Sequence, residues 1–264
     1  MRRYLVFFRA GPNSLHPRLV AAEPDRNWDC CVSWYSEPRP DNTIEYSVVG
    51  GENKFEAFHE FFLGLGDKAI YRYYLVVDDD IDFAPGDISR FFDLCARYDV
   101  YLCQPALRWG THRNHDVTLW NPVCTLRSTS FVEVMAPCFS APAVAALLDT
   151  FRLNRSTWGI DYAWASRLQG QGRIAVIDAV RVAHTKPVDL GDGPFYRKMR
   201  ALGSDPEEDY GRIKASFPRF GALKTAWNGH IFRFPCPEGL GNLATRLFEG
   251  IKKRLHRWLS ARTK

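Results

Sequence analysis

The segment Tyr73-Tyr74-Leu75-Val76-Val77-Asp78-Asp79-Asp80-Ile81-Asp82-Phe83 decides the fold of this chain. An apolar run of aromatic and β-branched residues stops abruptly at three consecutive aspartates. The run is short, so it is typical of a buried strand rather than a helix. The aspartates then lie at the carboxyl end of a strand, where open α/β sheets bind their ligands. The segment therefore predicts an α/β protein with a polar site at this sheet edge.

Three adjacent carboxylates repel one another unless a cation or a set of hydrogen-bond donors neutralises them. Oxygen ligands of this kind suit Mg²⁺ or Mn²⁺, which would typically also hold a phosphate. The alternative is an acidic turn after a strand, with Asp82 or Asp87 capping the next helix. Three acids in register behind a buried strand favour the metal site.

Length and composition are those of a globular protein that can form one large core. The 264 residues include 18 Phe, 11 Tyr and 8 Trp, an aromatic content that suits either core packing or stacking on sugars and nucleotides. The formal net charge is +5, and much of the excess lies in the C-terminal tail. Because the body has no basic patch studded with aromatic residues, we expect no nucleic-acid partner.

Cysteine usage and the N-terminus indicate a location in the cytoplasm. The seven cysteines are odd in number and form no CxxC pair, which argues against a disulfide framework or a structural zinc site. The chain enters a strand directly after Arg2 and Arg3, with no pattern of a signal peptide. No apolar run reaches the length needed to span a membrane.

Strand and helix patterns alternate through the first 190 residues. We expect strands over 4–8, 27–35, 44–49, 100–104, 131–135 and 174–177, besides the strand that ends at the aspartates, and helices from Lys54 and over 87–98, 141–151 and 156–168. Segment 105–130 has no clear period. The alternation predicts a Rossmann-like mixed, mostly parallel sheet flanked by helices.

Three regions are expected along the chain: a catalytic domain over 1–190, an irregular lid or acceptor segment over 191–242, and a basic amphipathic helix over 243–264. One face of that helix collects the apolar residues Leu243, Leu247, Phe248, Ile251, Leu255 and Leu259. The helix could lie on an anionic membrane surface, or it could pack its apolar stripe on the body.

The order of several motifs resembles that of nucleotide-sugar glycosyltransferases with the GT-A fold. It is most similar to a poorly characterised family of predicted glycosyltransferases from bacteria and plants. The motifs, which cover roughly residues 4–190, are Arg9-Ala10-Gly11 with Ser14-Leu15-His16, Asn27-Trp28-Asp29, Lys54-Phe55, Asp78-Asp79-Asp80, Trp158-Gly159-Ile160-Asp161, and Asp178-Ala179 followed by His184.

The resemblance implies a donor site at the acid cluster. In such enzymes strand-end acids hold a divalent cation, here Mn²⁺ or Mg²⁺, that bridges the diphosphate of the donor. Asp80 is the expected direct ligand, with Asp78 as a second ligand or a contact to the nucleotide, and Asp79 could point either way. A late histidine, His184, is expected to complete the metal site. Contacts to the nucleotide or its phosphates are expected from Arg9, Asn13, Lys54 and Lys186.

The resemblance also implies an acceptor site. Asp161 lies where Trp-Gly-x-Asp enzymes place the carboxylate that takes the proton of the acceptor hydroxyl. Trp158 would stack on a sugar ring, and Trp109 and His112, with His115 and Asp116, would border the acceptor. A first-turn aspartate stabilised by the helix dipole is the alternative for Asp161.

The expected function is therefore a metal-dependent glycosyltransferase. It would move a sugar from a nucleoside-diphosphate donor, with a UDP-sugar as first choice, to a glycan or glycolipid acceptor in bacterial surface polysaccharide or glycolipid assembly. We expect a cytoplasmic protein, with the inner face of the cytoplasmic membrane as a further expectation. Alternatives are a nucleotidyltransferase, a glycosidase that needs no metal, and a carbohydrate-binding protein without turnover.

Overall fold

A mixed sheet forms the centre of the fold in a computed structural model that describes residues 1–66, 71–168, 170–187, 193–217, 229–236 and 238–262. Its strands are β1 (Tyr4–Ala10), β2 (Trp28–Trp34), β3 (Tyr46–Val49), β4 (Tyr73–Asp78), β5 (Ile81–Asp82), β6 (Val100–Leu107), β7 (Cys124–Ser128), β8 (Cys138–Ser140), β9 (Arg173–His184) and β10 (Ile231–Phe232). The helices are α1 (His16–Ala21), α2 (Lys54–Leu65), α3 (Asp87–Arg97), α4 (Ala141–Leu147), α5 (Ile160–Arg167), α6 (Pro194–Ala201), α7 (Pro206–Ser216) and α8 (Glu238–Arg262), with short 3₁₀ helices η2 (Asp116–Thr118) and η3 (Leu148–Arg152).

The strand order is β10-β7-β9-β6-β8-β4-β1-β2-β3, with β5 attached to β9. Strands β4, β1, β2 and β3 run parallel, and β6 and β9 form a second parallel pair. The short strand β8 lies between β4 and β6 and is antiparallel to both. The prediction of a mixed, mostly parallel sheet flanked by helices is confirmed.

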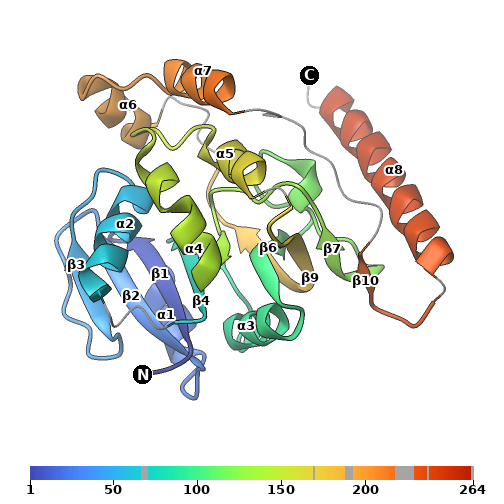
Figure 1. Ribbon diagram of the computed structural model, residues 1–264, viewed down its shortest axis with the longest axis horizontal. Helices are drawn as coiled ribbons and strands as arrows, with labels where there is room; N and C mark the ends of the chain where they lie inside the picture. The colour runs from blue at the N-terminus through green and yellow to red at the C-terminus, as the bar shows by residue number, and fades with distance from the viewer. Residues whose placement is uncertain (67–70, 169, 188–192, 218–228, 237, 263–264) are drawn as a thin grey trace.

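Alternating side chains of the central strands fill two separate core layers. Tyr73, Leu75 and Val77 of β4 face the layer covered by α1 and α3, whereas Tyr74 and Val76 face α2, α4 and α5. This period of two is what a strand buried on both faces produces. Figure 1 shows the helices on the two sides of the sheet. The parallel strands end at the same edge of the sheet, and Asp78 lies at this edge as the last residue of β4.

The order of elements differs from expectation at several places, among them helix α1 and strand β5, which were not expected. Residues 131–135, expected as a strand, lie in a loop, and the strand that follows is β8 over Cys138–Ser140. Segment 105–130, which shows no period, contains η2 and the five-residue strand β7. The apolar residues Phe131 and Val132 are buried in the loop, which explains why the segment has the composition of a strand.

The region after residue 190 is more regular than expected. Segment 191–242 contains two helices, α6 and α7, and the strand β10, which pairs with β7. The side chain of Asp205 caps α7 by accepting from the backbone N–H groups of Glu207 and Glu208. Part of the expected lid, 218–228, lies outside the described residues.

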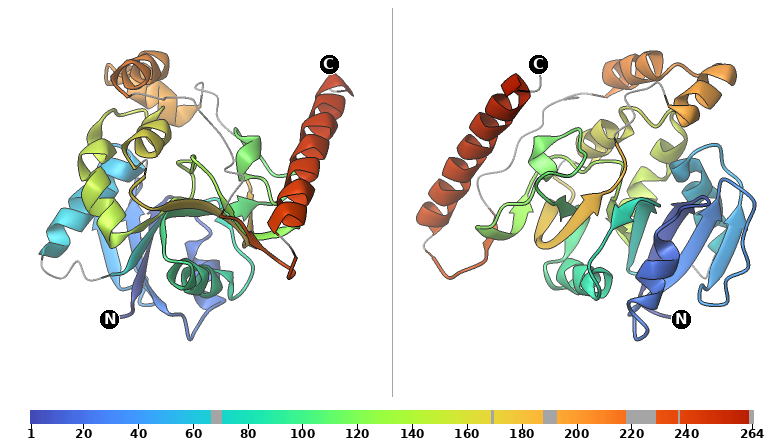
Figure 2. Two further views of the ribbon diagram at one scale, coloured as in Figure 1. Left: turned by 45° about the vertical axis from the view of Figure 1, so that its right-hand side comes forward. Right: turned by 180° about the vertical axis from the view of Figure 1, so that it is seen from behind.

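Helix α8 lies along the β7 and β10 edge of the sheet (Figures 1 and 2). A buried ion pair holds it there: the Arg127 guanidinium lies 2.7 Å from Asp178 of β9 and 3.2 Å from Glu249 of α8. Arg127 and Asp178 are almost completely buried. Burying either charge alone would cost free energy, and each side chain neutralises the charge of the other. In the part of the chain that the structure describes, no helix combines the length and the apolar character needed to cross a membrane.

We expect Asp178→Ala to lower the free energy of unfolding by about 3–5 kcal/mol, because it leaves the buried Arg127 charge without its main partner. The matched control is Asp149→Ala, which removes a pair with Arg167 on the surface and should cost at most about 1 kcal/mol. Urea unfolding followed by tryptophan fluorescence measures both. Equal losses in the two variants would show that the buried Arg127 charge does not depend on Asp178.

Candidate active site

The three aspartates after β4 make contacts in three different directions. Asp78, the last residue of β4, lies 2.7 Å from the ammonium group of Lys54 at the start of α2. Asp79 faces the end of β1, and Asp80 faces the end of β9. Asp78 is the last residue of the strand, and Asp79 and Asp80 lie in the turn that follows it, so the three side chains have different main partners. Lys186 links two of them, because it lies near both Asp79 and Asp80.

Asp79 acts as a tether between strands. Its buried carboxylate accepts hydrogen bonds from the Gly11 backbone N–H at 2.9 Å and from the Tyr35 hydroxyl at 3.0 Å. Lys186 lies 3.2 Å away. A Cβ at Gly11 would lie 2.2 Å from the Tyr35 ring, so a side chain at this position would displace the ring. These contacts satisfy Asp79 internally, so it shapes the edge of the sheet and has little capacity left for a ligand.

Asp80 and His184 face each other. The two-residue strand β5 pairs with the end of β9 and places Ile81 opposite His184. The imidazole Nε2 lies 3.5 Å from Asp80 Oδ1, and Lys186 lies 3.7 Å from the other oxygen. The predicted approach of the late histidine to the acid cluster is therefore observed in the geometry, which leaves its role as a metal ligand a proposal.

The electrostatics of this pair favour charged forms. Burial opposes the ionised form of Asp80, yet His184 and Lys186 outweigh it and lower the pKa of that carboxyl. Burial likewise opposes protonated His184, but the Asp80 and Asp78 carboxylates raise the pKa of the imidazole. His184 Nε2 is the ring nitrogen that faces Asp80, and the backbone of His112 also interacts with the ring and favours its protonated form.

The residues present fit a divalent cation of the Mn²⁺ type. A carboxylate oxygen and an imidazole nitrogen are both suitable ligands, and Asp80 Oδ1 and His184 Nε2, 3.5 Å apart, supply one each. Asp78 is less available because its oxygen is engaged by Lys54.

A second group of metal-ligating side chains lies elsewhere in the core. Cys95, Cys103 and Cys138 are buried with sulfur atoms within 4.8 Å of one another, although the sequence contains no CxxC pair. Cys103 and Cys138 face each other across the β6–β8 pair, and Cys95 reaches them from α3. The surroundings are apolar, so these thiols pack as small hydrophobic side chains.

Lys54 is an internal cross-link. Its ammonium group, 7% exposed, binds Asp78 and donates to the carbonyl oxygens of Val134 at 2.6 Å and Met135 at 3.2 Å. It therefore joins the acid edge to the loop before β8. The expected contact of Lys54 with a phosphate would require it to release these partners.

Asp161 lies on the other side of that loop, in the first turn of α5. It is buried, 6% exposed, and accepts from the Tyr162 backbone N–H at 2.9 Å. Burial raises the pKa of its carboxyl to about 7, although backbone N–H groups, including that of Val134, oppose the rise. A carboxyl with this pKa can exchange a proton near neutral pH. Asp161 thus has the properties expected of a general base.

Glu133 is a second buried acid that sequence analysis missed. It is 1% exposed, and the polar groups of Asn114 lie near its carboxyl and favour the ionised form. Burial, with the nearby Asp161 charge, raises the pKa of Glu133 to about 8. Its only sequence signal is an acid inside the apolar run Phe131–Met135, at a position where a buried strand would not tolerate a charge.

A strained turn presents Trp158 and Asp161. Thr157 has φ 65°, an uncommon value for a β-branched residue, and Gly159 has φ 84° as the residue before α5. The Trp158 indole N–H donates to the Tyr196 hydroxyl of α6 at 2.9 Å. Trp158 is half-buried against that ring, so the expected stacking face is partly occupied by α6.

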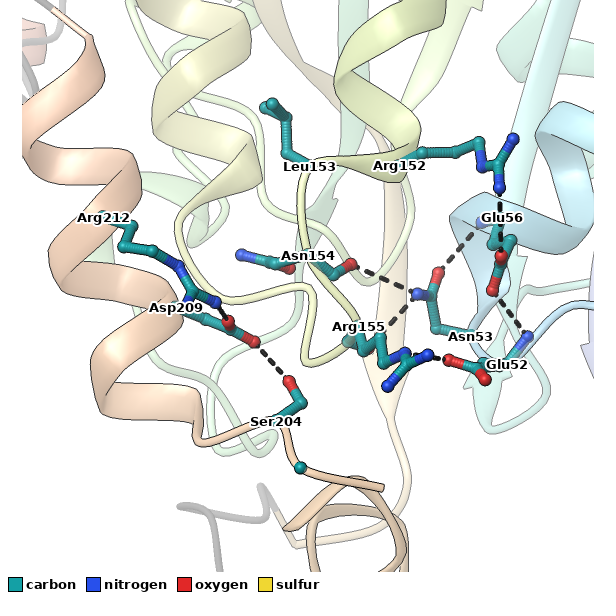
Figure 3. A pocket seen from close by; sticks show the side chains of 11 residues that line it. Glu52, Asn53, Glu56, Arg152, Leu153, Asn154, Arg155, Ser204, Asp209 and Arg212 are labelled. Atoms are coloured by element: carbon teal, nitrogen blue, oxygen red, sulfur yellow. Dashed lines mark hydrogen bonds and ion pairs between the residues drawn. The ribbon is translucent and has the colours of Figure 1, made fainter. Parts of the chain in front are cut away.

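A polar pocket of about 360 Å³ lies between the start of α2, the loop before Trp158, and α7 (Figure 3). None of the predicted site residues lines it. Its three arginines each face a carboxylate, in the pairs Arg155 with Glu52, Arg152 with Glu56, and Arg212 with Asp209. Because the charges cancel, the pocket is no anion site. Its contacts bind the loop before Trp158 to α2 and α7.

The other predicted residues are more dispersed. Arg9 donates to the carbonyl oxygens of Gly50 and Gly51 at 2.6 and 2.7 Å and to Ser33, so its guanidinium stabilises a loop. Asn13 is exposed in the turn after β1. His112 is exposed with its ring edge toward His184, at a centroid distance of 6.4 Å.

Two further residues expected near the acceptor lie at different depths. Trp109 is 40% exposed and contacts Phe248 of α8. His115 packs between Phe131 and Tyr162, and burial lowers the pKa of its imidazole. Asp116 pairs with Arg113 in the same loop. His112 therefore lies beside the candidate metal site, whereas His115 forms part of the core.

Comparisons with known proteins support the fold. No family model matches the sequence, and no curated protein matches it significantly. The chain is similar to the crystal structure of GalNAc-T7 with UDP, GalNAc and Mn²⁺, at a TM-score of 0.52 and 10% identity, covering 81% of this chain and 48% of that one. The crystal structure of S. aureus TarS has a TM-score of 0.48 and 12% identity, covering 83% of this chain and 44% of that one. The crystal structure of A197 from STIV has a TM-score of 0.41 and 13% identity, covering 72% of this chain and 87% of that one.

The chain therefore spans about half the length of GalNAc-T7. At 10% identity the similarity shows the fold, and it confirms the predicted GT-A-like architecture.

The two buried acids predict a specific pH dependence of stability. In the unfolded chain Glu133 has a pKa of about 4.3, so between pH 5 and 8 the folded state binds more protons than the unfolded state. The folded chain keeps the Glu133 proton up to about pH 8. The stability that this proton contributes is fully present below the unfolded pKa and is lost as the pH rises toward 8. The free energy of unfolding should fall over this range by up to about 1.4 kcal/mol per pH unit for such a group.

We therefore expect Glu133→Gln to flatten this fall and to be more stable than the parent at pH 8. The exposed Glu207→Gln on α7 is the control and should leave the slope unchanged. Urea titrations at pH 5, 6, 7 and 8 give the slopes. Identical slopes for Glu133→Gln and the parent would show that the carboxyl does not stay protonated.

Proposed function

We propose that this protein is a metal-dependent glycosyltransferase that moves a sugar from a nucleoside-diphosphate donor to a glycan or glycolipid acceptor. The observations on which the proposal depends are the approach of Asp80 to His184 after β4 and the buried acid Asp161, whose pKa is about 7; Glu133 lies within electrostatic reach of both Asp161 and Asp78. The GT-A-like fold is shared with GalNAc-T7, which was crystallised with UDP and Mn²⁺, and this supports a UDP-sugar donor and Mn²⁺.

The donor site lies at the end of β4. Asp80 and His184 would hold the cation, with Asp78 as a further oxygen ligand if Lys54 yields it. The bound cation would offset the negative charge of the departing diphosphate. Lys186, which is exposed and already beside Asp79 and Asp80, would lie close to the phosphate oxygens. Its positive charge would add to the stabilisation of the leaving group.

Asp161 would act on the acceptor. The acceptor oxygen forms a bond to the anomeric carbon, the bond from that carbon to the diphosphate breaks, and the hydroxyl proton passes to the Asp161 carboxylate. Glu133, protonated below about pH 8, adds no second negative charge beside it at neutral pH. Asp161 can therefore be ionised while its neighbour is neutral, which is the arrangement that a base in a dry site requires.

The test of the donor site uses Asp80→Asn, with Asp82→Asn as the matched control because Asp82 pairs with Arg18 on the surface. Calorimetry should show UDP binding to the parent that requires Mn²⁺ and is lost with chelator. Asp80→Asn should weaken this binding at least tenfold, and Asp82→Asn should not change it. Absence of Mn²⁺-dependent binding of any nucleoside diphosphate to the parent would overturn the proposal.

The test of Asp161 uses turnover of a library of sugar nucleotides. Because the ionised carboxylate is the active form, kcat/KM should rise about tenfold per pH unit below pH 7 and level off above it. Asp161→Asn should lower kcat by about 10²–10⁴-fold while UDP affinity stays unchanged. The anomeric configuration of the product, compared with that of the donor, decides between single displacement and a retaining route.

Two other outcomes would assign a different function. Release of pyrophosphate in place of a nucleoside diphosphate would indicate a nucleotidyltransferase. Binding of sugars or nucleotides with no turnover across the whole library would indicate a carbohydrate-binding protein on this fold.

A further inference from the structure

Helix α8 is packed on the body through its less apolar face. The residues that face the sheet are Gly241, Thr245 and Glu249, four residues apart and therefore on one side of the helix. Thr245 is fully buried with its hydroxyl 3.4 Å from Cys124, and a Cβ at Gly241 would lie 2.5 Å from the Phe232 ring. Glu249 pairs with Arg127.

The opposite side of α8 is an exposed apolar stripe, formed by Leu240, Leu243, Leu247 and Ile251. These side chains are 61%, 52%, 61% and 52% exposed. Leu247 is two residues from Thr245, about 200° round the helix, so the stripe points away from the sheet. Phe248, which the helical pattern predicts on the same face, packs against Trp109 instead. The side chains of Leu255 and Leu259 lie outside the described residues.

An amphipathic helix normally buries its apolar side on the protein. Here the buried side is held by an ion pair, a hydroxyl and a close glycine contact, and four large aliphatic side chains face solvent. Such a continuous exposed row is expected of a surface that binds something.

The charge of α8 identifies the class of partner. Its sequence contains six Lys and Arg but two Glu, a net charge of +4, in a chain whose total is +5. Two copies of this helix would repel each other, so a second copy of the chain is a poor partner. A surface that offers both an apolar layer and negative charge satisfies both properties, and an anionic lipid bilayer is such a surface.

We propose that the stripe Leu240, Leu243, Leu247 and Ile251 is a docking surface for an anionic membrane, with α8 lying in the plane of the lipid headgroups. The helix has 25 residues, or about 37 Å at 1.5 Å per residue. Its apolar side chains would enter the acyl boundary, and its basic residues would be attracted by the headgroups.

The docked helix would lie beside the candidate acceptor site, a consequence that rests on the proposed function. Trp109 contacts Phe248 of α8, and Thr111, two residues on, exchanges hydrogen bonds with the His184 backbone at 2.7 and 2.9 Å. One loop thus joins the membrane-facing helix to the candidate metal site. This arrangement favours a membrane-anchored glycolipid as acceptor over a free glycan.

The experiment is co-sedimentation of the full chain with vesicles of 30% phosphatidylglycerol in phosphatidylcholine, and with vesicles of phosphatidylcholine alone. The test variant is Leu243→Ser/Leu247→Ser/Ile251→Ser. The control is Leu63→Ser on α2, a position with the same exposure of about one half. All residues changed are on the surface, and thermal melting confirms that each variant is folded.

We expect the parent and Leu63→Ser to bind the anionic vesicles, to bind the neutral vesicles at least tenfold more weakly, and to be released as NaCl increases. The triple variant should lose at least tenfold in partition coefficient. No binding of the parent, or equal binding of the triple variant, would overturn the proposal. A parent dimer that the triple variant abolishes, without vesicle binding, would also overturn it in favour of a second copy.

Calorimetry of UDP with Mn²⁺ on the same preparations separates this inference from the proposed function. Vesicle binding requires no donor and no turnover. Binding to vesicles without binding of UDP would support the docking surface and contradict the proposed transferase. Binding of UDP without binding to vesicles would support the transferase and contradict the docking surface.

Discussion

A two-residue antiparallel ladder between β5 and β9 brings the candidate metal-binding residues together. It sets Ile81 opposite His184, and the next contact along, from the Thr185 backbone N–H and hydroxyl to the Asp80 carbonyl, extends it. Without that ladder, Asp80 and His184 would be two polar side chains more than a hundred residues apart in the chain. Because β9 also pairs with β6 and β7, the position of His184 depends on the part of the sheet formed by β6, β9 and β7.

Much of the fold could be predicted because its signals are local. The period of two in β1 and β4, the glycines and polar residues at strand ends, and the helical spacing of α2 and α3 all lie within short windows. Two elements differ from the prediction for reasons that are also local. The apolar residues Phe131 and Val132 predict a strand, but they belong to a buried loop. Helix α7 is not predicted, although Asp205 followed by Pro206 is an N-terminal capping signal.

Sequence and resemblance single out the run Asp78-Asp79-Asp80, Asp161 and His184 as candidates, and their functional roles stay predictions. What each side chain contacts is decided by tertiary packing, which a sequence window does not contain. Arg9 and Lys54 illustrate this difference, since both cations expected at the diphosphate are bound to backbone carbonyls and, for Lys54, to Asp78. Glu133 could not be assigned because its neighbour Asp161 is 28 positions away.

The close contact between Gly11 and Tyr35 has an evolutionary consequence. The aromatic ring fills the space that a side chain at position 11 would need, and its hydroxyl holds Asp79. A side chain at position 11 would displace the Tyr35 ring, so the two positions are expected to covary. A larger residue after β1 goes with a smaller or displaced one after β2, and the acid edge would then lose a hydrogen-bond donor to Asp79. Covariation of these two sites across natural variants would be a record of that steric exclusion.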